Sequence, residues 1–149
     1  MTERQGAPNS KTALPDGYKL LLVGVHSDVV IKERVEKQLL KKASKDQRAE
    51  LEDLIKKYAK GGPNGVPGRK WATDEGWFPS RKSKELRLEA FKPWQLRAYG
   101  FCRNFNGKST FFIVGFDPVK KQDGADQSVI DACGAEALRI DRLIKSQGG

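Results

Sequence analysis

A β-hairpin is the clearest element of this sequence and occupies residues 96–116, which read LRAYGFCRNFNGKSTFFIVGF. Two runs rich in aromatic and β-branched residues, 96–103 and 110–116, flank the dipeptide Asn106-Gly107. Asn-Gly readily adopts the positive φ angles of a tight turn between antiparallel strands. We therefore predict two paired strands joined at this dipeptide.

Two further strands are predicted upstream of the hairpin. In residues 85–90, ELRLEA, polar and apolar residues alternate, which places Arg87 on one face of a sheet and Leu86 and Leu88 on the other. Residues 18–26, YKLLLVGVH, form a nearly continuous apolar run of strand length. Such a run predicts a central strand that is buried on both faces.

Two helices are predicted between these strands, and a third at the C-terminal end. The first follows a cap at Ser27 or Asp28, after which aliphatic residues recur at every fourth position. The second follows a capping box formed by Ser44 and Gln47 and ends near residue 61 at a Gly-Gly-Pro sequence. The third starts near residue 126, where apolar residues again recur every three or four positions.

One domain is expected from the length of the chain. Its 149 residues match the usual size of a single domain. Residues 1–16 are polar and contain two prolines, which predicts a flexible tail and leaves 17–149 for the domain. These strands and helices predict an α+β fold.

The chain is strongly basic, with 28 Lys and Arg against 19 Asp and Glu and a formal net charge of +9. Such a charge attracts polyanions, and nucleic acid is the natural candidate. Two cysteines and one histidine provide neither a disulfide framework nor a zinc motif, so we expect no metal and no cofactor. Because no apolar run reaches the roughly 20 residues of a membrane span, we expect a cytoplasmic protein with no membrane partner.

Residues 61–84 are predicted to form a long loop in which basic and aromatic residues are interleaved. Loops of this length usually have a function, which makes this one a candidate contact surface. The alternative is that Trp71, Trp77 and Phe78 close the edge of the hydrophobic core.

Two arginines on neighbouring strands, Arg87 and Arg97, give the main functional hypothesis. If both project from one polar face, their guanidinium groups can clamp a phosphodiester and stabilise the charge that develops during its cleavage. The alternative is an ion-pair network, because Glu85 and Glu89 share the strand face of Arg87.

Other candidate groups each have a plain structural alternative. Lys120 and Lys121 follow the last strand and could reach over the same face, or they could simply be solvated. His26 ends the first apolar run as either a general base or a hydrogen-bonded structural residue. Cys102 and Cys133 lie in apolar patterns typical of buried thiols that only pack.

Four blocks of the sequence, taken in order, resemble the RelE/HigB-like toxins and their phage-derived relatives. The blocks are Glu85-Leu86-Arg87, Leu96-Arg97-Ala98-Tyr99, Phe112-Ile113-Val114-Gly115-Phe116 leading to Lys120-Lys121, and Val129-Ile130-Asp131-Ala132. The resemblance implies a small twisted antiparallel sheet packed against an N-terminal helical hairpin, with a C-terminal helix.

It also implies a toxin of a type II toxin–antitoxin system. Such a toxin is an endoribonuclease that cuts mRNA, commonly on the ribosome, and is neutralised by a cognate antitoxin protein. The family needs no metal, because basic side chains assist the attack of the ribose 2′-hydroxyl on the adjacent phosphate.

The basic motif positions of the family fall on candidate catalytic residues Arg87, Arg97 and Lys120, with candidate RNA contacts at Lys82, Lys84, Arg103 and Lys121. Many active members place a Tyr or His near the C-terminus, whereas the last Tyr here is Tyr99. One alternative is therefore a non-catalytic RNA- or ribosome-binding module on the same fold. Another is a protein-interaction domain whose basic face meets an acidic partner.

Overall fold

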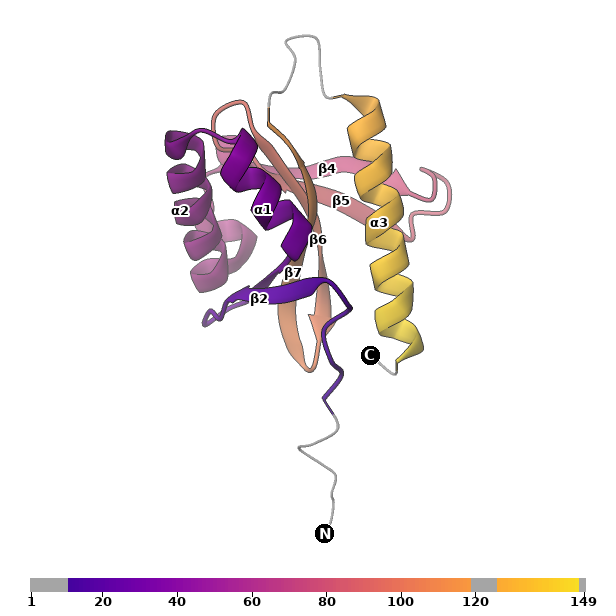
Figure 1. Ribbon diagram of the computed structural model, residues 1–149. Coiled ribbons are helices and arrows are strands. Elements are labelled where there is room, and N and C mark those ends of the chain that lie inside the picture. The colour runs from indigo at the N-terminus through magenta and orange to yellow at the C-terminus, as the bar shows by residue number, and fades with distance from the viewer. Residues whose placement is uncertain (1–10, 119–125, 148–149) are drawn as a thin grey trace.

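A six-stranded sheet with helices on both faces forms the mixed α+β architecture of the computed structural model, which describes residues 11–118 and 126–147 (Figure 1). Across the sheet the strand order is β2-β3-β7-β6-β5-β4. The strands are β2 (Tyr18–Leu22), β3 (Asp28–Lys32), β4 (Trp71–Phe78), β5 (Leu86–Phe91), β6 (Arg97–Phe105) and β7 (Lys108–Asp117). The helices are α1 (Glu33–Lys42), α2 (Lys45–Gly61) and α3 (Gln127–Ser146), with short 3-10 turns η1 (Gly62–Gly65) and η2 (Gly68–Lys70).

The helices divide the core into two layers, one on each face of the sheet. Helices α1 and α2 pack on one face, called here the α1–α2 face, and α3 packs on the other, the α3 face (Figure 1). Strand β7 serves both layers, because Phe111 and Ile113 point to the α1–α2 face while Phe112 and Val114 point to the α3 face. A strand covered on both sides is apolar throughout, which explains the unbroken hydrophobic run of β7.

The hairpin predicted around Asn106-Gly107 is confirmed as β6 and β7. Asn106 has φ 53° and Gly107 has φ 78°, the positive values that the turn requires. The capping box of Ser44 and Gln47 at the start of α2 is also confirmed, as is the start of α3 near its N-cap, Asp126.

The N-terminal strands differ from the prediction. Only Tyr18–Leu22 of the run 18–26 form a strand, and this strand, β2, lies at the edge of the sheet rather than in its centre. The predicted helix cap at Ser27 or Asp28 is wrong. Residues Asp28–Lys32 instead form β3, whose consecutive β-branched side chains are buried on both faces. The first helix therefore begins only at Glu33.

The sheet is not wholly antiparallel, which corrects the expected topology. Strands β3 and β7 run parallel, with Val29 opposite Phe111, while the remaining neighbours pair antiparallel. The expected loop 61–84 also contains β4, which pairs with β5 and forms the edge of the sheet opposite β2.

Part of the predicted tail lies against the domain. The backbone N–H of Thr12 donates to Oδ1 of Asn106 at 2.8 Å, and Nδ2 of Asn106 donates to the carbonyl of Thr12 at 2.9 Å. Leu14 packs against the core of the α3 face. Residues 1–10 of that predicted tail lie outside the described residues.

Candidate functional site

Arg87 and Arg97 are far apart along the paired strands β5 and β6. Glu89 lies opposite Gly100, which places Arg87 opposite Cys102 in this antiparallel register. Arg97 is five residues farther along β6, about 17 Å at roughly 3.4 Å per residue. The two guanidinium groups therefore cannot grip one phosphate from their strand positions.

The side chains of these two arginines also project from opposite faces of the sheet. Arg87 alternates with Leu86 and Leu88, which face α3, so it projects on the α1–α2 face. Arg97 has the parity of Tyr99, which faces α3. The predicted clamp is therefore wrong, because strand alternation assigns a shared face only when the register between the strands is known.

Arg97 instead holds the turn that precedes β6. Its NH1 group donates to the carbonyl oxygens of Trp94 at 3.1 Å and Leu96 at 2.9 Å. Trp94 has φ 56° and is 61% exposed, while its backbone N–H donates to Glu50. Lys70 bonds the same carboxylate and lies 5.4 Å from the Trp94 ring centroid. This turn presents an exposed tryptophan beside a cation, a feature that no sequence pattern indicates.

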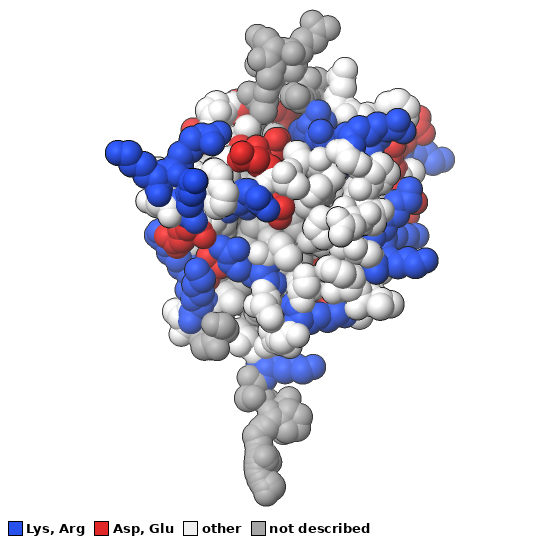
Figure 2. All heavy atoms as spheres, turned by 180° about the vertical axis from the view of Figure 1, so that it is seen from behind, with Lys and Arg blue, Asp and Glu red and all other residues white. Residues whose placement is uncertain are grey.

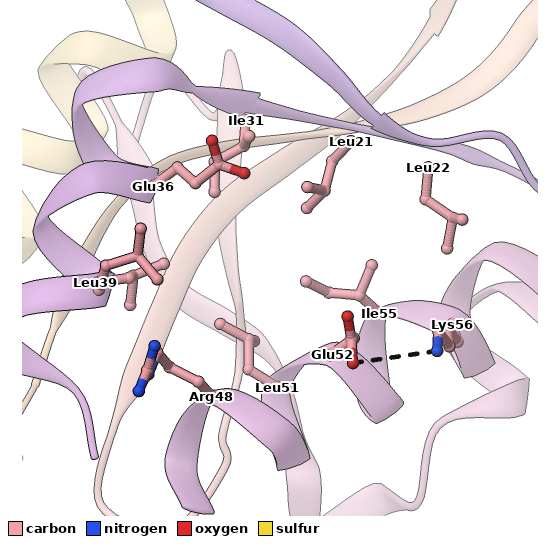
Figure 3. A pocket seen from close by; sticks show the side chains of 11 residues that line it. Leu21, Leu22, Ile31, Glu36, Leu39, Arg48, Leu51, Glu52, Ile55 and Lys56 are labelled. Carbon is pink, nitrogen blue, oxygen red and sulfur yellow. Dashed lines mark ion pairs between the residues drawn. The ribbon is translucent and has the colours of Figure 1, made fainter. Parts of the chain in front are cut away.

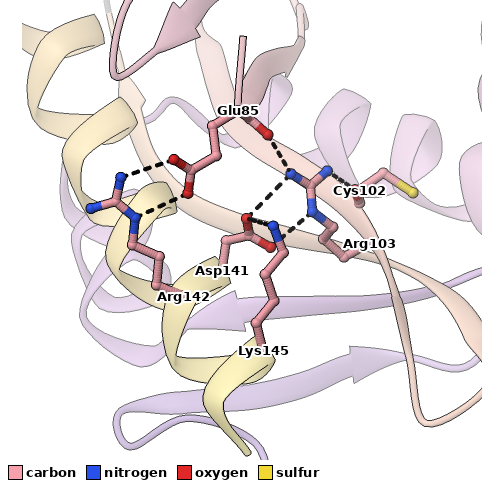
Figure 4. Close-up of polar contacts among 6 residues, drawn as sticks. All are labelled: Glu85, Cys102, Arg103, Asp141, Arg142 and Lys145. Atoms are coloured by element: carbon pink, nitrogen blue, oxygen red, sulfur yellow. Dashed lines mark hydrogen bonds and ion pairs between the residues drawn. The ribbon is translucent and has the colours of Figure 1, made fainter. Parts of the chain in front are cut away.

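Arg103 belongs to an ion-pair network between the sheet and α3 (Figure 4). Its Nε donates to Asp141 at 2.8 Å, and its NH2 group donates to the carbonyl of Glu85 at 3.0 Å. Asp141 is 0% exposed and also pairs with Lys145 at 3.1 Å. The hydrogen bonds of the neighbouring Arg142 lower the pKa of the Glu85 carboxyl. Arg103 therefore anchors α3 to β6, and its donors are engaged inside the protein.

Cations gather around Trp77 where β4 ends and β5 begins. Trp77 lies opposite Arg87 in the sheet, and the Arg87 guanidinium carbon is 5.7 Å from the ring centroid. Nζ of Lys84 is 5.8 Å from the same ring, and Arg81 and Lys82 are exposed in the connecting turn. These five residues, called here the β4–β5 surface, combine four positive charges with one aromatic ring.

Arg87 also forms an ion pair on its own strand. Its NH2 group lies 3.4 Å from Oε2 of Glu89, so the ion-pair alternative is confirmed for Glu89, whereas Glu85 pairs with Arg142 instead. Burial raises the pKa of Glu89, and the charge of Arg87 opposes that shift. The Arg87 side chain remains 44% exposed, so it can still meet a ligand from solvent.

The three aromatic residues of the 61–84 segment have different roles. Trp71 is buried and contacts Tyr58 and Phe91, with ring centroids 5.2 Å and 5.0 Å away. Phe78 packs against the core under α3. Both therefore close the core, as one alternative predicted, while Trp77 is half-buried among the cations of the β4–β5 surface.

His26 starts a short chain of hydrogen bonds beneath the α1–α2 face. Its Nδ1 lies 2.6 Å from Oγ of Ser27, which donates to Oγ of Ser109 at 2.9 Å. Sγ of Cys102 lies 3.4 Å from the same Ser109 oxygen. This bonding fits the structural alternative for the histidine. Cys133 lies on α3 and is buried against the sheet, where burial raises the pKa of its thiol to about 12, as expected of a packing residue.

Lys120 and Lys121 lie outside the described residues. Within residues 11–118 and 126–147, no three His, Cys, Asp or Glu side chains come close enough together to hold a metal ion. None of the helices in these ranges combines the length and apolar character that crossing a bilayer requires.

Basic side chains are spread over the surface as well as concentrated at the β4–β5 surface. On the side of the molecule seen in Figure 2, Lys and Arg gather toward the margins around a largely uncharged middle. No protein-family model, curated protein or solved structure matches this chain. The resemblance to the RelE/HigB toxins therefore stays a prediction that rests on its four sequence blocks.

Proposed function

We propose that the protein binds single-stranded RNA through the β4–β5 surface. The observation that carries this proposal is the position of Lys84 and Arg87 beside the ring of Trp77, 5.8 Å and 5.7 Å from its centroid. Proteins that bind unpaired RNA stack bases on aromatic rings and arginine planes and contact phosphates with lysine and arginine. The net charge of +9 favours the same class of ligand.

Binding without cleavage is the function that this geometry supports best. Metal-independent cleavage needs several donors around one phosphate. Arg87 lies at the proposed surface, whereas Arg97 is bonded to the turn before β6 and Arg103 to Asp141. The RNA-binding module, whether free or on the ribosome, is therefore our first candidate.

The second candidate is an mRNA-cleaving toxin with a cognate antitoxin. It is favoured by the order of the four sequence blocks that resemble RelE/HigB-like toxins, and a RelE-like arrangement of the sheet is part of the same hypothesis. In that case Lys120 would have to supply the charge that Arg97 does not bring to Arg87.

The binding proposal can be tested with fluorescein-labelled single-stranded RNA and purified full-length protein. Lys84→Gln and Arg87→Gln should each weaken binding and reduce the slope of log affinity against log salt by about one unit. Trp77→Ala should cost about 1–3 kcal/mol of binding free energy through lost stacking. Lys57→Gln is the matched control, because it removes one charge from an exposed position on α2.

The control also decides how the result is interpreted. Equal losses in Lys57→Gln and Lys84→Gln would show unspecific attraction to the net charge and would refute a localised surface. Gel analysis of the same RNA after incubation distinguishes the two candidates, because the binding module leaves it intact and the toxin shortens it.

A further inference from the structure

An apolar cleft opens between β2 and the helix pair α1–α2 (Figure 3). Its volume is about 230 Å³, and aliphatic side chains from three elements dominate its wall: Leu21, Leu22, Leu39, Leu51 and Ile55. Strand β2 forms one edge of the sheet and β4 the other, so the cleft is separate from the β4–β5 surface.

Among the described residues, Arg48 of the cleft forms no ion pair. Arg48 lines the cleft, and Nε of Arg48 is buried with no hydrogen-bond acceptor among the described residues. The two carboxylates nearby already have cationic partners: Glu36 lies 2.7 Å from Lys19, and Glu52 lies 4.0 Å from Lys56 (Figure 3 shows the second pair). A guanidinium in this setting favours a carboxylate ligand, which it can bind by two parallel hydrogen bonds.

The apolar surface continues beyond the cleft itself. Leu40 lines the cleft and is 62% exposed, a large fraction for a leucine on a helix that packs against a sheet. Beside it, β2 is an edge strand, and no other strand of the described residues pairs with its outer backbone groups. Together these features suit a polypeptide better than a small molecule, because a polypeptide can cover both the aliphatic wall and the edge.

We propose that this cleft binds a segment of an acidic partner protein, which inserts bulky aliphatic side chains and places an Asp or Glu carboxylate on Arg48. Two other possible occupants, a second copy of the chain and its own N-terminal residues, do not suit the site. A second copy of this chain would bring another net charge of +9, which opposes association. Residues 1–10 of the chain contain only Met1, Ala7 and Pro8 as apolar side chains, with no bulky branched residue to fill an aliphatic cleft.

The test starts from a displayed library of random short peptides selected on the full-length protein. We expect the selected peptides to combine Leu, Ile or Met with at least one Asp or Glu. A synthesised copy of one selected peptide should bind Arg48→Glu and Leu40→Asp at least about tenfold more weakly than the wild-type protein. Matched controls are Arg34→Glu and Val25→Asp, which make the same charge changes at exposed positions outside the cleft and should alter affinity less than about twofold.

A charge swap makes the assignment specific. A peptide whose carboxylate is replaced by lysine should recover binding to Arg48→Glu while losing it to the wild-type protein. Equal losses in the cleft variants and the controls would overturn the proposal, as would selected peptides without acidic residues. A dimer seen by sedimentation that Leu40→Asp abolishes would also overturn it in favour of self-association. RNA affinity of Arg48→Glu should equal that of Arg34→Glu, which changes the net charge equally, so failure here is distinguishable from failure of the RNA proposal.

Discussion

Replacing Arg103 with alanine should destabilise the protein without weakening its binding to RNA. The guanidinium lies 2.8 Å from Asp141, which is 0% exposed, so the substitution leaves a buried carboxylate with one partner fewer. Breaking a buried ion pair by removing one partner costs about 3–5 kcal/mol. Lys145 remains 3.1 Å from the same carboxylate, and the Arg103 side chain is 29% exposed, so we expect the low end, about 3 kcal/mol.

Thermal unfolding followed by circular dichroism measures this loss. For a chain of this size about 1 kcal/mol shifts Tm by roughly 2–4 °C, so Tm should fall by about 6–12 °C. Arg142→Ala is the control, because its pair with Glu85 lies at the surface, where water screens the charges, and its Tm should change little. Unchanged Tm together with weaker RNA binding in Arg103→Ala would refute the structural role and favour the sequence-based prediction that Arg103 contacts RNA.

Three further substitutions or conditions probe the fold. Gly100→Ala should lower the folded yield severely, because a Cβ there would lie 2.2 Å from the carbonyl oxygen of Phe112; urea unfolding checks this. Burial opposes ionisation of Glu136, but hydrogen bonds from Arg139 and two further donors hold its pKa at about 2, against 4.5 for a free carboxyl. Because the pKa of Glu136 is lower in the folded than in the unfolded protein, its ionised carboxylate stabilises the fold fully at pH values above the unfolded pKa. Tm should therefore fall as pH drops from about 4.5 to about 2, and Glu136→Gln should flatten that decline. With its pKa raised to about 12 by burial, Cys133 should react with a thiol reagent at about pH 8 only after unfolding, as thiol titration with and without urea would show.

The C-terminal strands could be predicted because their signals are local. The turn at Asn106-Gly107 depends on the φ preferences of two adjacent residues, and the N-cap of α3 depends on the single residue Asp126. Alternation around Arg87 likewise needs only neighbours within one strand. Each of these features is decided within a few residues.

The two strands that the sequence did not reveal depend on distant partners. Ile31, Val35 and Leu39 fit one helical stripe, yet Ile31 lies in β3 because its backbone pairs with that of β7. Strand β4 contains Gly76 and an irregular register with β5, which make it resemble a loop. In both segments, pairing with a distant strand determined the secondary structure against the preference of the local sequence.

The candidate site shows the same limit. Arg87 was assigned correctly to the strand face opposite Leu86 and Leu88, but its partner is Trp77 of β4 and not Arg97 of β6. That pairing depends on a strand the sequence did not predict. Trp94 projects outward because its φ is 56° and Glu50 holds its backbone, and neither condition is visible in the sequence.

The parallel pairing of β3 with β7 has a consequence for synthesis of the chain. Val29 finds its strand partner in Phe111, so the segment with β2, β3, α1 and α2 leaves the ribosome long before its place in the sheet exists. Strands β5, β6 and β7 pair between near neighbours and can form first, after which the early segment docks. A nascent chain paused before β7 would leave the aliphatic residues of β3 uncovered, and chaperones that hold exposed apolar segments would recognise it at that stage.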